Sequence, residues 1–321
     1  MELLEKIIFW YKNSRPYSIP ITLLSWLLIF VFSLKSGGNA FLGLIALVGI
    51  LLTHLSTNLA DDYFDYKRLQ FDEFFLNSTK EIKCKYLKEG KASITDLRNV
   101  IIGMLSFAAL IGAILFFASG FYVAIFALIG LIIALSYSAF SSRGLGDIAV
   151  IIAYGPLMYE GVFYVMTGKL SLEVLILSIA AGTMVNTVLY AHMLMDYDED
   201  VISNKTTLCT RLGSKNNALK GLIIFYILGY SMLGIMAVRC SNILYLLPIL
   251  TLPLVFDLYK SLNIYNNDKT IIPCSHFWHF PLDNWKELSK NPNASFFFRF
   301  LFARNIVTYF MLLACCSVIF S

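Results

Sequence analysis

Residues 39–60 read NAFLGLIALVGILLTHLSTNLA, and residues 61–72 continue as DDYFDYKRLQFD. The first stretch is long and apolar enough to cross a bilayer as a helix, because about 20 such residues span the hydrocarbon layer. The second stretch places four aspartates directly after it. A polar site is therefore expected at one end of a membrane helix.

The rest of the chain repeats this apolar character. Of its 321 residues, 58% are hydrophobic and 14% are charged, and the mean hydropathy is +0.71, whereas soluble domains carry about 25% charged residues. We predict one all-α, polytopic membrane domain, residues 1–321, with about nine transmembrane helices. The first span follows the charged segment of residues 1–15, lacks a small-residue cleavage site and is expected to be retained as a helix. The predicted spans are residues 18–35, 39–60, 97–118, 120–139, 147–167, 172–195, 217–237, 241–260 and 298–320.

The distribution of basic residues predicts the orientation in the cell membrane, because Lys and Arg accumulate in cytoplasmic loops. With the N-terminus inside, all but three of the 25 Lys and Arg residues fall in cytoplasmic segments. The three outside are Lys35, Lys169 and Arg239. The polar site is then cytoplasmic and the C-terminus lies outside. The net charge of +4 follows from this topology, and no basic arm or RNA-binding motif indicates a nucleic-acid partner.

Polar side chains recur at helical spacing from the second span into the acidic motif of residues 58–72. Residues three and four apart share a helix face. Those that follow this spacing are His54, Asn58, Asp62 and Asp65, with Asp61 flanking them. Carboxylates this close together repel unless a cation or a proton intervenes. A bound divalent metal is the simplest expectation.

A second acidic motif, residues 196–200, follows the sixth predicted span. His192, Asp196 and Asp200 are spaced four apart and so share a helix face. Both motifs leave the membrane on the same predicted side. Because the longest polar connections also lie there, the chemistry is expected on the cytoplasmic face.

Oxygen ligands in both motifs suit Mg²⁺, which keeps waters and bridges a few carboxylates to phosphate oxygens. Basic residues lie just downstream and would take the remaining phosphate charge: Lys67, Arg68, Lys205 and Arg211. A solvated helix end is the alternative for either motif alone. Two such motifs beside membrane spans favour a functional site.

Several segments resemble the UbiA superfamily of intramembrane prenyltransferases over about residues 10–260. The likeness is greater to the 1,4-dihydroxy-2-naphthoate prenyltransferase branch, which serves menaquinone biosynthesis. The segments are Arg15-Pro16, residues 58–68 (NLADDYFDYKR), 144–147 (GLGD), 154–156 (YGP), Asp196-x-x-x-Asp200, 205–208 (KTTL) and 211–213 (RLG).

The resemblance implies a nine-helix bundle around a central cavity open to lipid. In such an enzyme both aspartate motifs hold Mg²⁺ against the diphosphate of a polyprenyl donor. Loss of diphosphate gives an allylic cation that attacks an electron-rich ring, and in the naphthoate branch a carboxylate leaves. Metal ions stabilise the departing charge, and a dry cavity protects the cation from water.

The resemblance also implies roles for individual residues. The implied metal ligands are Asn58, Asp62, Asp65, Asp196 and Asp200, of which Asn58 also contacts substrate. The implied substrate-binding residues are Arg68, Lys205, Arg211 and Tyr154. The chain departs from the family pattern at Asp61, where Asn is common, at Gln70-Phe71-Asp72, which replaces a Gly-x-Asp, and at His192.

The acceptor stays open on these residues. An aromatic quinone precursor such as 1,4-dihydroxy-2-naphthoate is the first expectation, and hydroxybenzoate, a tetrapyrrole or a glycerol lipid are alternatives. An ion-coupled secondary transporter is a more remote alternative, since intramembrane acids also mark ion pathways. Transport predicts access from both faces, whereas both acidic motifs here leave on one face.

Three further polar side chains could have structural roles, and two of them have a chemical alternative. Glu160 in the fifth span either handles a proton or the acceptor, or makes a structural hydrogen bond. His192 either handles the same proton or orients Asp196. For Asp147, which follows a glycine at a predicted helix start, an N-cap is the preferred interpretation.

The last long loop carries the pattern Cys274-x-His276-x-x-His279. Without a fourth ligand at suitable spacing, a soft-metal site is disfavoured. The aromatic residues Trp278 and Trp285 indicate instead a segment at the membrane interface, where such rings settle.

Overall fold

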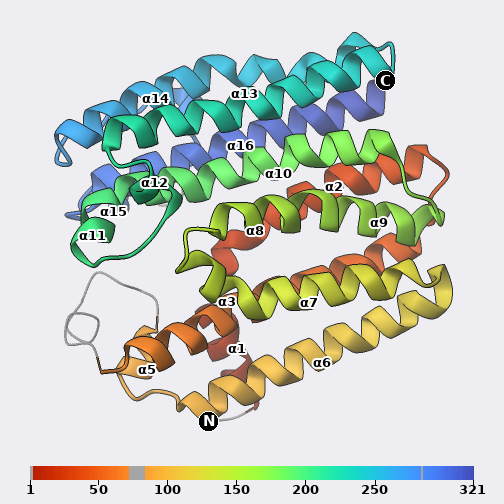
Figure 1. Ribbon diagram of the computed structural model, residues 1–321, viewed down its shortest axis with the longest axis horizontal. Coiled ribbons are helices and arrows are strands. Elements are labelled where there is room, and N and C mark those ends of the chain that lie inside the picture. The colour runs from red at the N-terminus through yellow and green to blue at the C-terminus, as the bar shows by residue number, and fades with distance from the viewer. Residues whose placement is uncertain (1–2, 72–83, 283–284) are drawn as a thin grey trace.

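The computed structural model describes residues 3–71, 84–282 and 285–321, so Asp72 of the first motif lies outside the described residues. In these ranges nine helices are long and apolar enough to cross a membrane, which confirms the predicted α-helical polytopic fold. Figure 1 shows them as a bundle of roughly parallel rods. The elements are α1 (Leu3–Asn13), η1 (Pro16–Ser18), α2 (Ile19–Lys35), α3 (Ala40–Leu69), α5 (Lys85–Lys88), α6 (Ile94–Ser119), α7 (Tyr122–Ser141), α8 (Gly146–Ile152), η2 (Ala153–Leu157), α9 (Met158–Thr167), α10 (Leu172–Met195), α11 (Tyr197–Ile202), α12 (Leu208–Arg211), α13 (Lys215–Arg239), η3 (Ile243–Thr251), α14 (Leu252–Asn267), η4 (Phe277–His279), α15 (Trp285–Leu288) and α16 (Ala294–Phe320).

The predicted spans agree with the observed helices to within a few residues at most ends, and α10 has the predicted bounds. The largest difference is α3, which continues as one helix to Leu69 and therefore carries the first acidic motif. No Gly or Pro interrupts the sequence between Ile50 and Leu69, so nothing in it ends the helix earlier.

Helix α10 is the most enclosed of the nine spans. It packs against α13 and α16 on one side and against α8, η2 and α9 on another. Helix α3 packs against α6 and α7, and α2 packs against α16 and α9. In Figure 1, α13, α14 and α16 lie above α10, while α7 and α6 form the lower edge. The two groups of helices are joined through the broken span α8–η2–α9.

This broken span contains a π-helical turn with Pro156 inside it and a non-helical backbone at Gly155 (φ −108°, ψ −112°). Two glycines let the turn approach α10. A Cβ on Gly155 would lie 2.7 Å from the carbonyl oxygen of Ser178, and one on Gly182 would lie 2.5 Å from that of Ile151. Such turns often occur at functional sites. Here the turn carries Tyr154.

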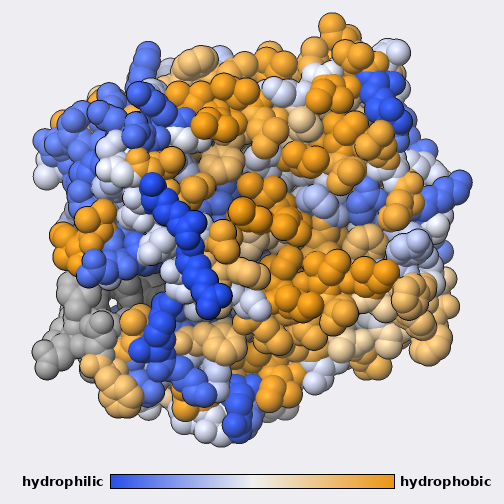
Figure 2. Space-filling view, viewed as in Figure 1, coloured by the Kyte–Doolittle hydropathy of each residue, from blue (hydrophilic) through white to orange (hydrophobic). Residues whose placement is uncertain are grey.

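The bundle has two polar ends separated by an apolar band (Figure 2). One end joins Lys35 to the carbonyl oxygen of Val318 at 3.0 Å, and Arg239 to Glu173 at 2.7 Å. This end therefore holds at least two of the three basic residues predicted to lie outside. The short helices α11, α12 and α15 lie at the other end (Figure 1). Which end faces the cytoplasm stays a prediction.

The segment between α14 and α16 is held at that other end by buried polar contacts. Arg299 is fully buried and donates to the carbonyl oxygens of Ser261 (2.8 Å) and Ile271 (3.2 Å). His279 contacts Asp257 at 2.8 Å, and the ring of His276 stacks on Trp278 at 4.4 Å between centroids. The histidines of the predicted loop thus make structural contacts.

Candidate active site

A cavity of about 1510 Å³ opens among α2, α3, α6, α7, the broken span, α10 and α16. Apolar side chains line most of it. Polar and charged residues from the two acidic motifs line part of the same cavity, among them Asn58, Asp61, Asp196 and Lys205. The fold therefore brings the two motifs, more than 120 residues apart in sequence, to one apolar chamber.

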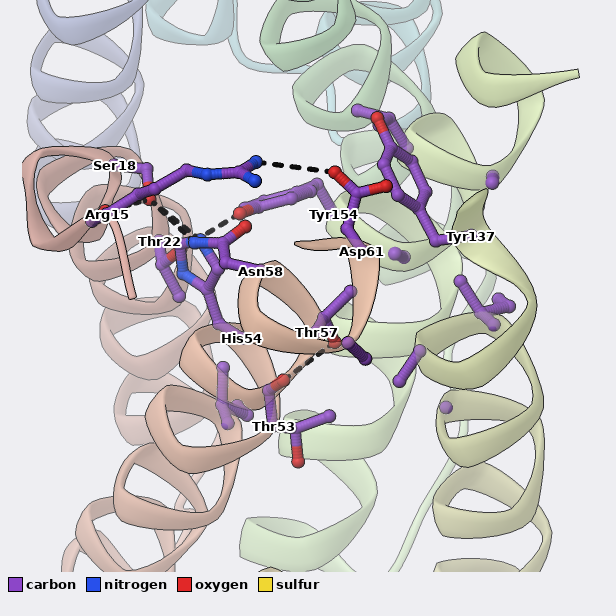
Figure 3. A pocket seen from close by; sticks show the side chains of 18 of the residues that line it. Arg15, Ser18, Thr22, Thr53, His54, Thr57, Asn58, Asp61, Tyr137 and Tyr154 are labelled. Carbon is purple, nitrogen blue, oxygen red and sulfur yellow. Dashed lines mark hydrogen bonds and ion pairs between the residues drawn. The ribbon is translucent and has the colours of Figure 1, made fainter. Parts of the chain in front are cut away.

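Arg15 connects the chain before α2 to the first motif. Its backbone is left-handed (φ 59°, ψ 56°) just before Pro16. One guanidinium nitrogen lies 3.4 Å from Asp61 Oδ2, and the other contacts Asp62 Oδ1. Burial alone would lower the pKa of Arg15, but the two carboxylates raise it above its ordinary value, so it stays charged. Figure 3 shows the guanidinium directed at Asp61.

Asp61, rather than Asp62 or Asp65, faces the cavity from this motif. Asp62 is buried and also lies 3.4 Å from the backbone nitrogen of Cys84. Asp65 is buried between Ser138 Oγ at 2.7 Å and Arg68 at 2.9 Å. The seven-residue spacing from His54 to Asp61 is close to two helical turns, which explains why Asp61 shares the cavity face with His54.

Asn58 and His54 continue the polar surface deeper along α3. Asn58 donates its side-chain nitrogen to the carbonyl oxygen of Ser14 at 2.9 Å, which leaves the amide oxygen as the atom suited to a cation. His54 lies 2.9 Å from Ser18 Oγ and 2.7 Å from Thr22 Oγ1. These side chains line the cavity together with Tyr154 (Figure 3).

The second motif lies where α10 gives way to α11. Asp196 ends α10, and its carboxylate lies 3.1 Å from His192 Nδ1. Asp200 is buried and contacts Lys205 Nζ at 3.0 Å. Burial raises the pKa of Asp200, and the Lys205 ammonium partly offsets this shift. His192, Asp196 and Lys205 line the cavity.

The donor atoms suit a hard divalent cation. Of the described part of the chain, no three His, Cys, Asp or Glu side chains form a ready-made metal cage. Mg²⁺ needs none, because it keeps several waters and takes one or two carboxylates plus substrate phosphates. Asp61 and Asp196 face the cavity, and Asp200 Oδ2 is buried with no hydrogen-bond partner among the described residues. The residues present therefore fit a cation that arrives with a phosphorylated substrate.

The model of the UbiA prenyltransferase family matches residues 18–280, which include both acidic motifs and the broken span. The chain belongs to the UbiA prenyltransferase family. It is a membrane-bound transferase, and family membership decides for an enzyme over a secondary carrier.

Relatives in this family support the expected branch. A 1,4-dihydroxy-2-naphthoate octaprenyltransferase of Haemophilus influenzae is 26% identical over 70% of this chain and 74% of its own length. The protein of that name from Escherichia coli is 25% identical over 64% of this chain and 69% of its own length. A UbiA prenyltransferase domain-containing protein 1 of Xenopus tropicalis is 26% identical over 79% and 74%.

Solved structures share the fold at low identity. A UbiA homologue from Archaeoglobus fulgidus, bound to DMAPP and Mg²⁺, has a TM-score of 0.58 and 13% identity, with 96% of this chain and 98% of that chain covered. A structure described as digeranylgeranylglyceryl phosphate synthase has a TM-score of 0.60 and 14% identity, with 99% and 100% covered. Both share the overall fold of this chain.

Two of the predicted site residues lie away from this cluster. Glu160 lies in α9, and its carboxylate accepts a hydrogen bond from the backbone nitrogen of Ser171 at the start of α10. This contact supports the structural interpretation of Glu160. Arg211 lies in α12 and donates to the carbonyl oxygen of Arg143 at 2.6 Å. Arg211 thereby fastens the α7–α8 connection.

Asp147 also differs from the prediction. It lies within the first turn of α8, whose N-cap is Leu145, so the expected N-cap role is wrong. Its carboxylate instead accepts a hydrogen bond from Asn186 of α10 at 2.9 Å. Asp147 therefore links α8 to α10 through a buried hydrogen bond and does not cap the start of α8.

Arg15 and Asp61 were not among the predicted metal-ligating or substrate-binding residues. Arg15 directly precedes Pro16 at the start of a membrane helix. A basic residue at this place usually indicates the orientation of the helix, so no contact with the acidic motif was expected. Asp61 lies beside Asp62, and the family pattern predicts Asp62 as a metal ligand. The spacing of His54, Asn58 and Asp61 was the available signal for the cavity face.

Proposed function

We propose that the enzyme transfers a polyprenyl group from a polyprenyl diphosphate to an aromatic quinone precursor, with 1,4-dihydroxy-2-naphthoate as first candidate and Mg²⁺ as cofactor. One observation carries this proposal: two acidic motifs with basic partners line one end of a large apolar cavity. A diphosphate with an apolar tail matches both parts of this chamber. The relative bound to DMAPP and Mg²⁺ supports the donor class.

The charged residues suit the diphosphate. Arg15 and Lys205 line the cavity from two parts of the chain and carry positive charge next to carboxylates. Arg68 stands next to Asp65 and is half-exposed. The electrostatic attraction between such basic groups and a diphosphate is stronger in a dry site than in water, because the local dielectric constant is low. They hold the donor with its first carbon directed into the cavity.

The carboxylates would hold the metal. In the first group Asn58 and Asp61 line the cavity and Asp62 and Asp65 are buried beside them, and Asp196 with Asp200 forms the second group. Bound Mg²⁺ would neutralise charge that develops on the departing diphosphate. The chain itself contributes the dry walls, which keep water from the allylic cation.

Aromatic side chains line the chamber near the second motif. Phe296 and Phe300 of α16 lie edge-on to His192, at 5.2 and 5.8 Å between ring centroids. Tyr137 and Tyr154 line the cavity from α7 and the broken span. Aromatic faces attract cations, so these rings suit a cationic intermediate and a flat acceptor.

The experiment uses membranes that contain the full chain, Mg²⁺, labelled polyprenyl diphosphates and a panel of acceptors. With carboxyl-labelled 1,4-dihydroxy-2-naphthoate, we expect label release in step with ring alkylation. An alkylated product that retains the label would exclude the coupled decarboxylation. Product formed only with glycerol-phosphate lipids would replace the aromatic acceptor by the class that the digeranylgeranylglyceryl phosphate synthase name suggests.

A further inference from the structure

Four side chains form a hydrogen-bonded row along the cavity, and the proposed diphosphate chemistry does not use them. The row runs from Tyr154 to Thr22 (3.1 Å), from Thr22 to His54 Nδ1 (2.7 Å) and from His54 Nε2 to Ser18 (2.9 Å). All four residues line the cavity. Figure 3 shows them between α2, α3 and the broken span.

The direction of each hydrogen bond follows from the end of the row. The carbonyl oxygen of Arg15 can only accept, so Ser18 Oγ donates to it at 2.8 Å. Ser18 has one hydroxyl proton and must therefore accept from His54 Nε2. Both ring nitrogens of His54 face uncharged hydroxyls, which favours the neutral ring at this half-buried position. Nδ1 is then an acceptor.

The same counting continues to the other end of the row. Thr22 donates its one proton to His54 Nδ1, so its oxygen accepts from Tyr154. Tyr154 thus donates its only hydroxyl proton to Thr22. A phenol oxygen that donates can still accept. The group that Tyr154 offers to the cavity is a hydrogen-bond acceptor.

The backbone fixes the place of this oxygen. Tyr154 lies in the π-helical turn. This turn packs closely against α10 because Gly155 in the turn and Gly182 in α10 have no side chains. The Tyr154 ring packs edge-on against His54 at 6.1 Å between centroids. A side chain held from both sides can discriminate between ligands, because little of it can rearrange.

We propose that Tyr154 Oη accepts a hydrogen bond from a free hydroxyl of the aromatic acceptor, and that Thr22 and His54 are positioning residues that set this polarity. The inference rests on the proposed function and specifies that the acceptor ring carries a free hydroxyl. It predicts that a hydroxylated ring binds productively, whereas an ether oxygen or a quinone oxygen at the same position faces another acceptor and is rejected.

The test compares kcat/KM for a dihydroxylated naphthoate and for its mono-O-methyl ethers in three proteins. Wild type is expected to prefer the free hydroxyl at one of the two positions by on the order of tenfold or more. Thr22→Val keeps the shape of the side chain but frees the Tyr154 proton for the ligand, so the preference should collapse and ether turnover should rise. Thr22→Ser keeps the hydroxyl and should keep the preference.

The steric bulk of the methyl group is the same in all three proteins and cancels in the comparison. Tyr154→Phe serves as a second variant and should also lose the preference, mainly through KM. Membrane insertion and thermal stability in detergent check that each variant folds. A preference that is equal in wild type and in Thr22→Val, or that Thr22→Ser loses as fully, would overturn the inference.

Failure of the proposed function gives a different result. In that case wild type alkylates no hydroxylated ring of the panel, and the hydroxyl subsite falls with it. Failure of the inference alone leaves ring alkylation intact while the methyl ethers and the variants show no linked change.

Discussion

Gly182 and Gly155 lie so close that a Cβ on Gly182 would come within 2.9 Å of the Cα of Gly155. Both are backbone positions on different helices, so neither can move aside as a side chain could. The contact sets the distance between α10, which leads to the second acidic motif, and the turn that carries Tyr154.

We expect Gly182→Ala to push the broken span away from α10. Overpacking of this kind costs about 1–3 kcal/mol. The midpoint of thermal unfolding should fall, and turnover should fall with it because Tyr154 is displaced. Gly103→Ala in α6 is the matched control, since no atom of the described residues lies within 4 Å of the added Cβ. Equal stability of the two variants would contradict the close contact.

Asp196→Asn should lower turnover by on the order of 100-fold, the usual loss when one preorganised electrostatic group is removed from a site. Asp196 lines the cavity, whereas Asp198 pairs with Lys215 (2.7 Å) and Lys269 (3.1 Å). Asp198→Asn is therefore the control and should retain most activity. Steady-state assays at limiting Mg²⁺ measure both. Similar losses in the two variants would argue against a special role for Asp196.

Arg15→Lys should weaken donor binding although the charge is kept. The guanidinium reaches Asp61 and Asp62 at once, and an ammonium is a point charge that cannot reproduce this fork. We expect a higher KM for the prenyl diphosphate and little change in the KM of the aromatic acceptor. An unchanged KM for the donor would show that Arg15 serves only to compensate the two aspartates.

Removal of divalent cations should abolish transfer and leave the bundle folded. The described carboxylates have basic or hydrogen-bonding partners of their own, such as Lys205 for Asp200 and Ser138 for Asp65, so the fold does not require the metal. Chelator treatment followed by Mg²⁺ should restore turnover, and circular dichroism should not change. Loss of helical signal on chelation would instead indicate a structural metal.

Single cysteines should report the orientation. In a background without the exposed Cys274 and Cys316, labels at positions 91 and 215 should react only from the cytoplasmic side, and a label at 169 only from outside. An impermeant thiol reagent on intact cells and on inverted vesicles makes the comparison. Labelling of position 91 in intact cells would invert the topology.

The sequence predicted the spans well because membrane helices need long apolar runs with no alternative way to satisfy the backbone. Leu172–Met195 is an example, with both bounds as predicted. It also predicted that the two acidic motifs share a site, since both follow spans that end on one face. Spacing and charge sufficed for these features.

Other features depend on contacts between distant residues. The fifth span was predicted as continuous over residues 147–167, and only the packing of Gly155 on α10 shows that a turn within it directs Tyr154 into the cavity. The same holds for Glu160, for which the sequence left a chemical role and a structural hydrogen bond equally open, and only the structure places the backbone nitrogen of Ser171 beside its carboxylate. A sequence shows that a polar group lies in the membrane, but not which neighbour satisfies it.

The contact of Lys35 with Val318 joins residues 283 positions apart, and α2 packs along α16. The ribosome adds about 5–20 residues per second, so roughly 15–60 seconds separate the synthesis of the two partners. During that interval α2 stands in the bilayer without its lateral neighbour, and the chamber lacks one wall. Assembly of the catalytic chamber must therefore wait until α16 leaves the insertion machinery. Truncation within α16 should then prevent closure of the chamber, even though it removes none of the aspartates.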